Sequence, residues 1–236
     1  MSLANTPPAS PLEPSGATPP IPLPTLAAVI ADLGGDIPLE RILTYPPIGT
    51  ATEADLIAVN EQKQVICELI NGTLVAKAMG SGESELAYLL GMYLLPFVKS
   101  RRLGVVLGAD GAMRFDPRNA LVPDVAFVSW DRMPNRQRPQ TAVWGVIPDL
   151  AIEVWNASNR PGEMRRKRER YFASGVRLVW EFHPRTESVV VYTSPDVGAT
   201  LDSTQTLDGG DVLPGFTLSL AEFYAALNDD GNTPSS

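Results

Sequence analysis

Three carboxylates interrupt short apolar segments that otherwise have the pattern of β-strands. Glu68 lies in VICELI, Asp124 in VPDVAFV and Glu153 in LAIEVW. Because strand side chains alternate between two faces, each carboxylate shares a face with apolar neighbours and should point away from bulk water. A buried carboxylate persists by taking up a proton, by pairing with a cation or by holding a metal ion. Any fold of this chain must therefore give three acids a partner.

The order of the expected elements predicts an α/β fold with a mixed sheet and helices packed on it. We expect helices at 26–33, 86–98, 162–174 and 220–227, and a further helix capped by Thr52. We expect strands at 65–70, 73–78, 104–109, 112–115, 124–129, 150–155, 176–182 and 188–193, and weaker ones near Thr206 and Val212. Asn71-Gly72 and His183-Pro184-Arg185 are each expected to turn a β-hairpin.

Composition separates this body from two tails. Residues 1–24 carry eight prolines with small residues, which is typical of a disordered segment. Residues 228–236 are polar and are expected to be a second disordered tail. The prediction is one domain over residues 25–227.

The scarcity of cysteine and histidine excludes several kinds of site. Cys67 is the single cysteine and His183 the single histidine of the 236 residues, so intrachain disulfides, Cys-rich zinc sites and multi-His metal centres are ruled out. Apolar stretches are broken well before the length of a membrane helix, and no basic and apolar leader opens the chain. We therefore expect a cytoplasmic protein without membrane contact, whose chemistry rests on carboxylates, lysine, arginine and hydroxyls.

The helix expected after Glu153 offers these acids a cation. On a helical wheel Lys167 falls beside the apolar Tyr171, whereas the other charges of RRKRER spread around the outer side. Lys167 is thus the best candidate to face the sheet, where its ammonium could satisfy a carboxylate or lie beside a metal-bound water.

Each of the four residues also has a simpler interpretation. Asp124 could open a strand and bind local backbone, and Glu153 could form a structural ion pair with an arginine. Glu68 could lie on an edge strand beside the Asn-Gly turn, and Lys167 could belong to a solvated helix face. Only their joint order along the chain favours one shared site.

That order resembles the bacterial Uma-two family of endonucleases. The residues that carry the resemblance are Glu68 in CELINGTLV, Asp124 in VPDVAFV, Glu153 in PDLAIEVWNAS, and Lys167 with Tyr171 in RRKRERYFASGVRLVW. The likeness extends from about residue 41 to residue 223 and includes GDVLPGFTLSLAEF. The family belongs to the PD-(D/E)XK, or restriction-endonuclease-like, superfamily.

The resemblance implies a restriction-endonuclease-like core with Asp124 and Glu153 on neighbouring strands as metal ligands. By analogy with the superfamily, the main-chain carbonyl of Val154 is a further ligand, and Glu68 matches an early acidic position of the family. The superfamily lysine two residues after the acid is replaced here by Trp155, and the family places it in the following helix, at Lys167. The chain departs from the family at Asn156-Ala157, where Ser-Pro is common, and at Glu83-Ser84, where a His is common.

The expected function is metal-dependent hydrolysis of DNA phosphodiesters by Asp124, Glu153, Lys167 and Glu68. Carboxylates without His or Cys favour Mg2+ or Mn2+, which would activate water and bridge to a phosphate oxygen. A homodimer is expected because paired scissions need two sites. With a formal net charge of -8, DNA binding should be weak and strongly salt-dependent, or should need a partner domain. Arginine clusters at 160–170 and 132–138 could provide local patches for it, or could be solvated surface.

Two other functions fit the same residues less closely. A noncatalytic module could keep the nuclease-like fold and bind nucleic acid or another protein. A lyase could use Lys167 as a Schiff-base nucleophile, but that reaction needs a lysine of depressed pKa, and neighbouring carboxylates would raise it.

Overall fold

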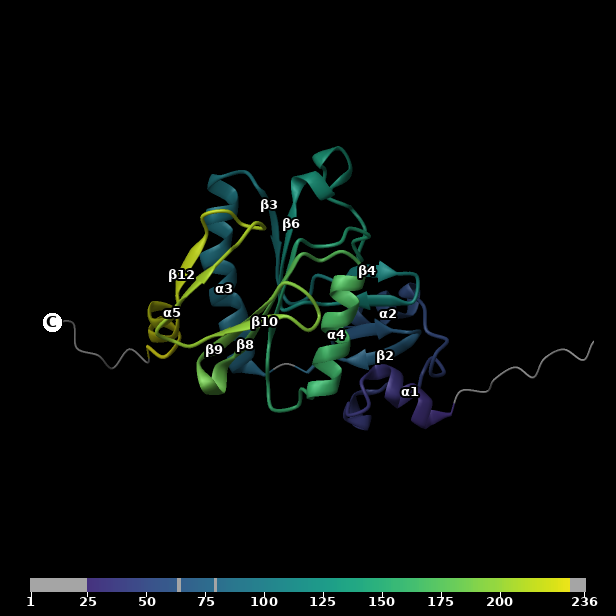
Figure 1. Ribbon diagram of the computed structural model, residues 1–236. Helices are drawn as coiled ribbons and strands as arrows, with labels where there is room; N and C mark the ends of the chain where they lie inside the picture. Colours follow the sequence, from purple (N-terminus) through teal and green to yellow (C-terminus); the bar gives the residue numbers. More distant parts are fainter. Residues whose placement is uncertain (1–24, 63–64, 79, 230–236) are drawn as a thin grey trace, which may run out of the picture.

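The computed structural model describes residues 25–62, 65–78 and 80–229 (Figure 1). The expected tails at 1–24 and, from residue 230, at the other end lie outside the described residues. The α-helices are α1 (Leu26–Leu33), α2 (Glu53–Glu61), α3 (Ser81–Ser100), α4 (Pro161–Ala173) and α5 (Leu220–Leu227). The strands are β1 (Cys67–Ile70), β2 (Thr73–Ala76), β3 (Gly104–Leu107), β4 (Met113–Asp116), β5 (Asn119–Leu121), β6 (Val125–Ser129), β7 (Leu150–Val154), β8 (Leu178–His183), β9 (Ser188–Tyr192), β10 (Gly198–Leu201), β11 (Thr206–Asp208) and β12 (Thr217–Ser219).

A six-stranded mixed sheet in the order β10-β9-β8-β7-β6-β3 forms the centre of the molecule. Strands β7 and β8 run parallel, and their other neighbours in this sheet are antiparallel. A parallel pair needs a crossover between its strands, and α4 supplies it. The expectation of a mixed sheet flanked by helices is therefore confirmed.

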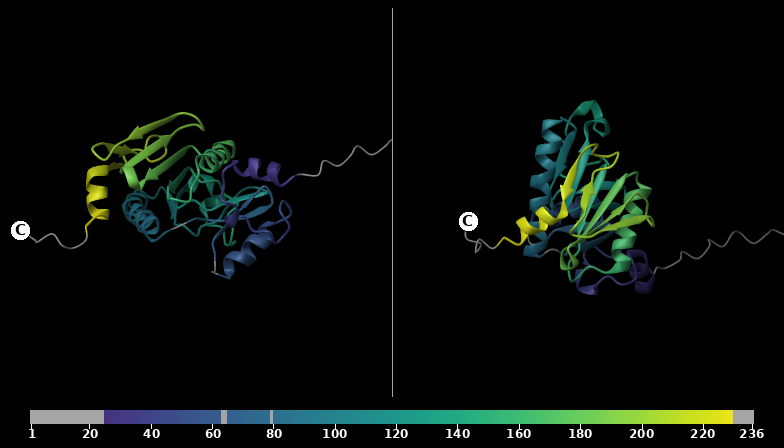
Figure 2. Two further views of the ribbon diagram at one scale, coloured as in Figure 1. Left: turned by 90° about the horizontal axis from the view of Figure 1, so that it is seen from below. Right: turned by 60° about the vertical axis from the view of Figure 1, so that its left-hand side comes forward.

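The two faces of this sheet carry different layers. Helices α3 and α5 and the β11–β12 hairpin cover one face, where they share a core with alternate residues of β7 such as Ile152 and Val154. Helix α4 and a four-stranded sheet cover the other face (Figures 1 and 2). Because side chains of β7 alternate, Glu153 points to the α4 side while its neighbours point to the α3 core. Glu153, the first of the three acids, therefore lies between the six-stranded sheet and α4.

The four-stranded sheet, in the order β2-β1-β5-β4, carries the second acid. Asn71 and Gly72 join β1 to β2 with positive φ values of 50° and 76°, which glycine and asparagine adopt most readily. This confirms the expected hairpin. Strand β1 lies between β2 and β5, so the interpretation of Glu68 as an edge-strand residue is wrong. The three-residue strand β5 is too short to be recognised from its sequence.

Several expected boundaries differ from the structure. Asp124 lies just before β6 and Trp155 just after β7, although the backbone N–H groups of both still bond to neighbouring strands. The strand expected near Val212 is found after Gly215 instead, because Gly215 turns the chain with a φ of 80°. Strand β10 was not anticipated. Within the described residues no helix has both the length and the apolar character needed to cross a membrane.

Candidate functional site

The Lys167 ammonium lies between two carboxylates that come from different sheets. Its Nζ is 2.8 Å from Glu153 Oε2 of β7 and 2.8 Å from Glu68 Oε1 of β1. The three side chains are between 3% and 8% exposed. Lys167 therefore faces the sheet from the buried side of α4, and its interpretation as part of a solvated helix face is wrong.

Asp124 lies opposite Glu153 across the β6–β7 pair. The register pairs Val125 with Ile152, so one further step along both strands brings Asp124 to Glu153. The backbone N–H of Val154 donates to Asp124 Oδ2 over 2.6 Å, which fixes the carboxylate at the end of β7. The acids expected from neighbouring strands are thus brought to one place.

Lys77, which the sequence did not single out, is the partner of Asp124. Its Nζ lies 2.8 Å from Asp124 Oδ1, and both side chains are almost fully buried. Lys77 Nζ forms no hydrogen bond within the described residues, so the contact is an ion pair without hydrogen-bond alignment. The sequence signal is the alternation Thr73, Val75, Lys77, which continues the buried face of β2 one step past its end.

Further donors hold the other two acids in place. The Tyr171 hydroxyl of α4 donates to Glu153 Oε1. The backbone N–H of Val122 donates to Glu68 Oε1 over 2.8 Å. Among the residues that the structure describes, the cation paired with both acids is Lys167 and no arginine binds either, so the interpretation of Glu153 as the partner of an arginine is wrong.

Three acids and two ammonium groups leave the cluster with an excess of negative charge. Burial raises the pKa of Glu153 to about 7, and the carboxylates of Asp124 and Glu68 add to the effect while Lys167 opposes it. Burial would also raise the pKa of Glu68, but the ammonium groups of Lys167 and Lys77 bring it below its usual value. For Lys167 burial works toward a lower pKa, and the three carboxylates outweigh it, so its pKa is raised. The cluster therefore favours an added proton or cation.

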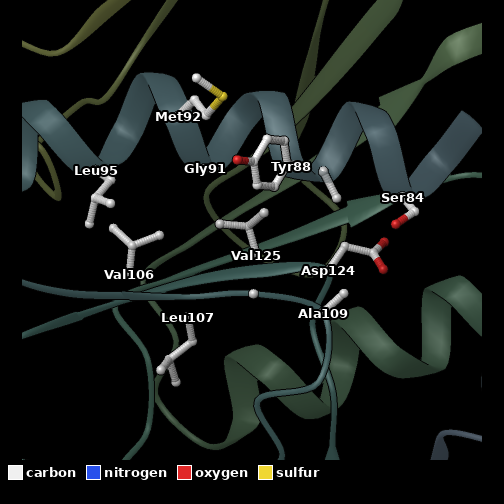
Figure 3. Close-up of a pocket in the computed structure, with 12 residues that line it drawn as sticks. Ser84, Tyr88, Gly91, Met92, Leu95, Val106, Leu107, Ala109, Asp124 and Val125 are labelled. Carbon is white, nitrogen blue, oxygen red and sulfur yellow. The ribbon is translucent and has the colours of Figure 1, made fainter.

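A cleft of about 360 Å³ gives access to Asp124. Figure 3 shows Asp124 and Ser84 at one end, with Tyr88, Met92 and Leu95 of α3 along the wall. Glu153, Glu68 and Lys167 are not among the residues that line this cleft. Asp124 is thus the acid of the cluster that a molecule entering from the α3 side meets.

A family model described as "Putative restriction endonuclease", that of Uma2, matches residues 53–221. The chain belongs to the Uma2 family. The matched range contains all four residues that the sequence singled out, and Lys77 as well. Membership of Uma2 indicates a nuclease and hence a hydrolase.

A solved structure supports the same fold. It is described as a "putative nuclease belonging to DUF820 from Anabaena variabilis ATCC 29413", and it is similar to this chain with a TM-score of 0.62 and 18% sequence identity. The likeness covers 70% of this chain and 92% of that one. The Uma2 chain therefore has a restriction-endonuclease-like fold. A search of curated proteins finds no match.

Nucleases of this fold usually use divalent metals, and the donor chemistry of the cluster fits such an ion. Mg2+ is commonly held by one or two carboxylates together with water, and Asp124 and Glu153 supply two carboxylates at the end of one strand pair. Within the part of the chain that the structure describes, no three acidic, histidine or cysteine side chains gather closely enough to hold an ion together. Two carboxylates are therefore what the described residues would offer such an ion, and water would complete its coordination.

Proposed function

We propose that this chain is a metal-dependent endonuclease that hydrolyses DNA phosphodiesters at the Asp124, Glu153, Lys167 and Glu68 cluster. One observation carries the proposal: the Lys167 ammonium is 2.8 Å from both Glu153 and Glu68, and Asp124 lies opposite Glu153. A buried network of acids with an excess of negative charge is costly to maintain, which supports a functional reason for it.

Each residue has a role that follows from its contacts. Asp124 and Glu153, with the main-chain carbonyl of Val154, would hold Mg2+ or Mn2+, and Glu68 would hold a second ion or act through water. When bound, the ion supplies positive charge for a phosphate oxygen and lowers the pKa of water. Lys167 stays protonated because its pKa is raised, so it can neutralise negative charge on phosphate and orient water.

The backbone and hydroxyl contacts preserve this arrangement between reactions. The N–H of Val154 keeps Asp124 at the mouth of the α3 cleft. The Tyr171 hydroxyl keeps one oxygen of Glu153 fixed while Lys167 binds the other. Groups held in this way need little rearrangement when substrate binds, which is the main source of electrostatic catalysis.

The test is cleavage of supercoiled and single-stranded DNA with Mg2+ or Mn2+ by wild type, Asp124→Asn and Lys167→Met. Asp149→Asn is a matched control, because Asp149 is similarly buried just before the other end of β7 and pairs with Arg132 at 2.9 Å. We expect both site variants to lose about 100-fold or more in rate, and the control to retain activity if it stays folded. Cleavage by Asp124→Asn at the wild-type rate would refute the assignment.

A noncatalytic nucleic-acid-binding module is the second candidate. It is favoured by the two ion pairs, because Lys77 and Lys167 already neutralise part of the charge of Asp124 and Glu153. In this case Mn2+ titrated into the protein would leave both acids unoccupied, and no DNA would be cut. A Schiff-base lyase is not supported, because the pKa of Lys167 is raised rather than lowered.

A further inference from the structure

Two aromatic rings stack beside the candidate site, at the carboxyl ends of β7 and β8. The parallel register pairs Val154 with Phe182, so the next residues, Trp155 and His183, lie side by side. Their ring centroids are 4.9 Å apart and their planes differ by 29°. Trp155 follows Glu153 by two residues, so the ring pair and the acid belong to the same face of the sheet.

A buried ion pair fixes the tryptophan of this ring pair. Trp155 Nε1 donates to Glu181 Oε2 over 2.9 Å, and Arg168 Nη1 donates to Glu181 Oε1 over 2.6 Å. The Arg168 guanidinium also lies 3.8 Å from the centroid of the Tyr192 ring. Because Glu181 is 2% exposed and neutralised by Arg168, it does not repel an approaching anion. The indole is therefore held in position by contacts within the protein.

Trp155 and His183 both line two clefts, of about 570 Å³ and 490 Å³. Arg165 lines the first and Arg185 the second. Neither side chain forms a hydrogen bond or an ion pair within the described residues, unlike Arg166, which binds Glu169. Each cleft thus combines an aromatic wall with an arginine whose charge is available.

Proteins that bind single-stranded nucleic acid commonly use this combination. Aromatic side chains stack on unpaired bases, and arginines neutralise the phosphates between them. A base in a duplex has its faces covered by its neighbours and cannot use such a wall. The ring pair lies near the acid cluster, since Trp155 follows Glu153 by two residues and shares its face of the sheet.

We propose that Trp155, His183, Arg165 and Arg185 bind an unpaired DNA strand next to the Asp124 and Glu153 cluster. The inference rests on the proposed nuclease function and specifies its substrate as single-stranded DNA or an unpaired end. The bases stack against the ring pair, and the arginines on either side contact the backbone.

The experiment measures binding by fluorescence anisotropy in EDTA at low salt, where no cleavage occurs. The probes are a labelled oligothymidylate, an abasic strand of the same length and a duplex. The aromatic variants are Trp155→Ala, Trp155→Phe and His183→Ala. The charge variant is the double change Arg165→Ala/Arg185→Ala, and its control is Arg102→Ala, an exposed arginine beyond the far end of α3.

Stacking predicts that Trp155→Ala weakens oligothymidylate binding by about 5- to 150-fold and that Trp155→Phe weakens it less. Neither change should alter the affinity for the abasic strand. The double arginine variant should weaken both single-stranded probes and lower the salt slope by about 1.4, at about 0.7 for each lost phosphate contact. Wild type should prefer the single strand over the duplex, and Arg102→Ala should bind as wild type does.

Equal binding by wild type and all aromatic variants would overturn the proposal, as would an equal loss on abasic and normal strands. If Trp155→Ala does not fold, His183→Ala and the double arginine variant decide the question. Because binding is measured without metal, the two proposals can fail separately. If the protein binds the strand but cuts no DNA in Mg2+, the proposed nuclease function is refuted. If it cuts DNA but the variants bind the strand as wild type does, the proposed strand-binding site is refuted.

Discussion

Removing the Lys167 ammonium should destabilise the fold in a way that depends on pH. Lys167→Met keeps most of the side-chain volume but leaves Glu153 and Glu68 without the cation that lies 2.8 Å from each of them. Both carboxylates are buried, so water cannot replace the ammonium. The folded protein must then either bury uncompensated charge or protonate the acids.

Breaking a buried ion pair by removing one partner costs about 3–5 kcal/mol of unfolding free energy. Arg166→Met is the matched control on the same helix, because Arg166 and Glu169 form an exposed pair with side chains 45% and 34% exposed. An exposed pair of this kind is worth about 0.2–1 kcal/mol. The two variants should therefore differ several-fold in their loss of stability.

The pH dependence follows from the sign of the pKa shifts. Loss of Lys167 removes an influence that lowers the pKa of Glu153 and of Glu68. The folded-state pKa of Glu153 therefore rises further above its usual value of 4.5, and that of Glu68 rises from below it. A carboxyl whose pKa is raised by folding is destabilising when ionised, so the penalty is small below pH 4.5 and grows as pH rises through the folded value.

Urea unfolding at pH 5 and pH 8 measures both effects, in EDTA so that no metal contributes. We expect Lys167→Met to lose more stability at pH 8 than at pH 5, and Arg166→Met to lose little at either pH. Equal losses for the two variants would contradict the description of Lys167 as the cation of a buried cluster. A loss for Lys167→Met that does not vary with pH would show that the acids stay satisfied without it.

Three further predictions concern the wild-type site and its surroundings. Because the pKa of Glu153 is raised to about 7, its contribution to stability should decline between pH 4.5 and pH 7. In Glu153→Gln the urea concentration at the unfolding midpoint should therefore vary less with pH over that range. Burial raises the pKa of Cys67 to about 11, so a thiol reagent should label it in urea but only slowly in the folded protein. A Cβ on Gly162 would lie 2.2 Å from Gly34 O and 2.6 Å from Asp36 Oδ1, so Gly162→Ala should cost about 1–3 kcal/mol in urea unfolding.

The sequence predicted the placement of Lys167 because helix periodicity is a local property. Met164, Lys167 and Tyr171 are the buried positions of α4 at spacings of three and four, and this pattern can be read without knowledge of the rest of the fold. The alternation of β7 in the same way predicted that Glu153 shares a face with buried residues. For each of the two residues, it was enough to know whether its own segment forms a helix or a strand.

The surroundings of Lys77 and Glu68 were harder to predict, because they depend on contacts with residues far away in the sequence. Lys77 follows the end of a short strand, a position where lysine is usually solvated, and its partner Asp124 comes 47 positions later in the numbering. Glu68 is interior only because β5, a strand of three residues, pairs with β1. The local sequence does not indicate that Lys77 meets Asp124, or that the three residues of β5 form a strand beside β1.

The arginine-rich helix shows how a sequence pattern can group residues that the fold separates. Arg168 was expected in one basic cluster with Arg165, yet it is 11% exposed and bound to Glu181, whereas Arg165 has no partner within the described residues. Consecutive residues on α4 thus serve two clusters: Lys167 holds the acids, and Arg168 fixes Glu181 and through it Trp155. Because Trp155 also follows Glu153 by two residues at the end of β7, a shift of α4 along the sheet would displace the acid cluster and the aromatic wall together. One strand and one helix therefore set the spacing between the proposed chemistry and the proposed binding of the strand.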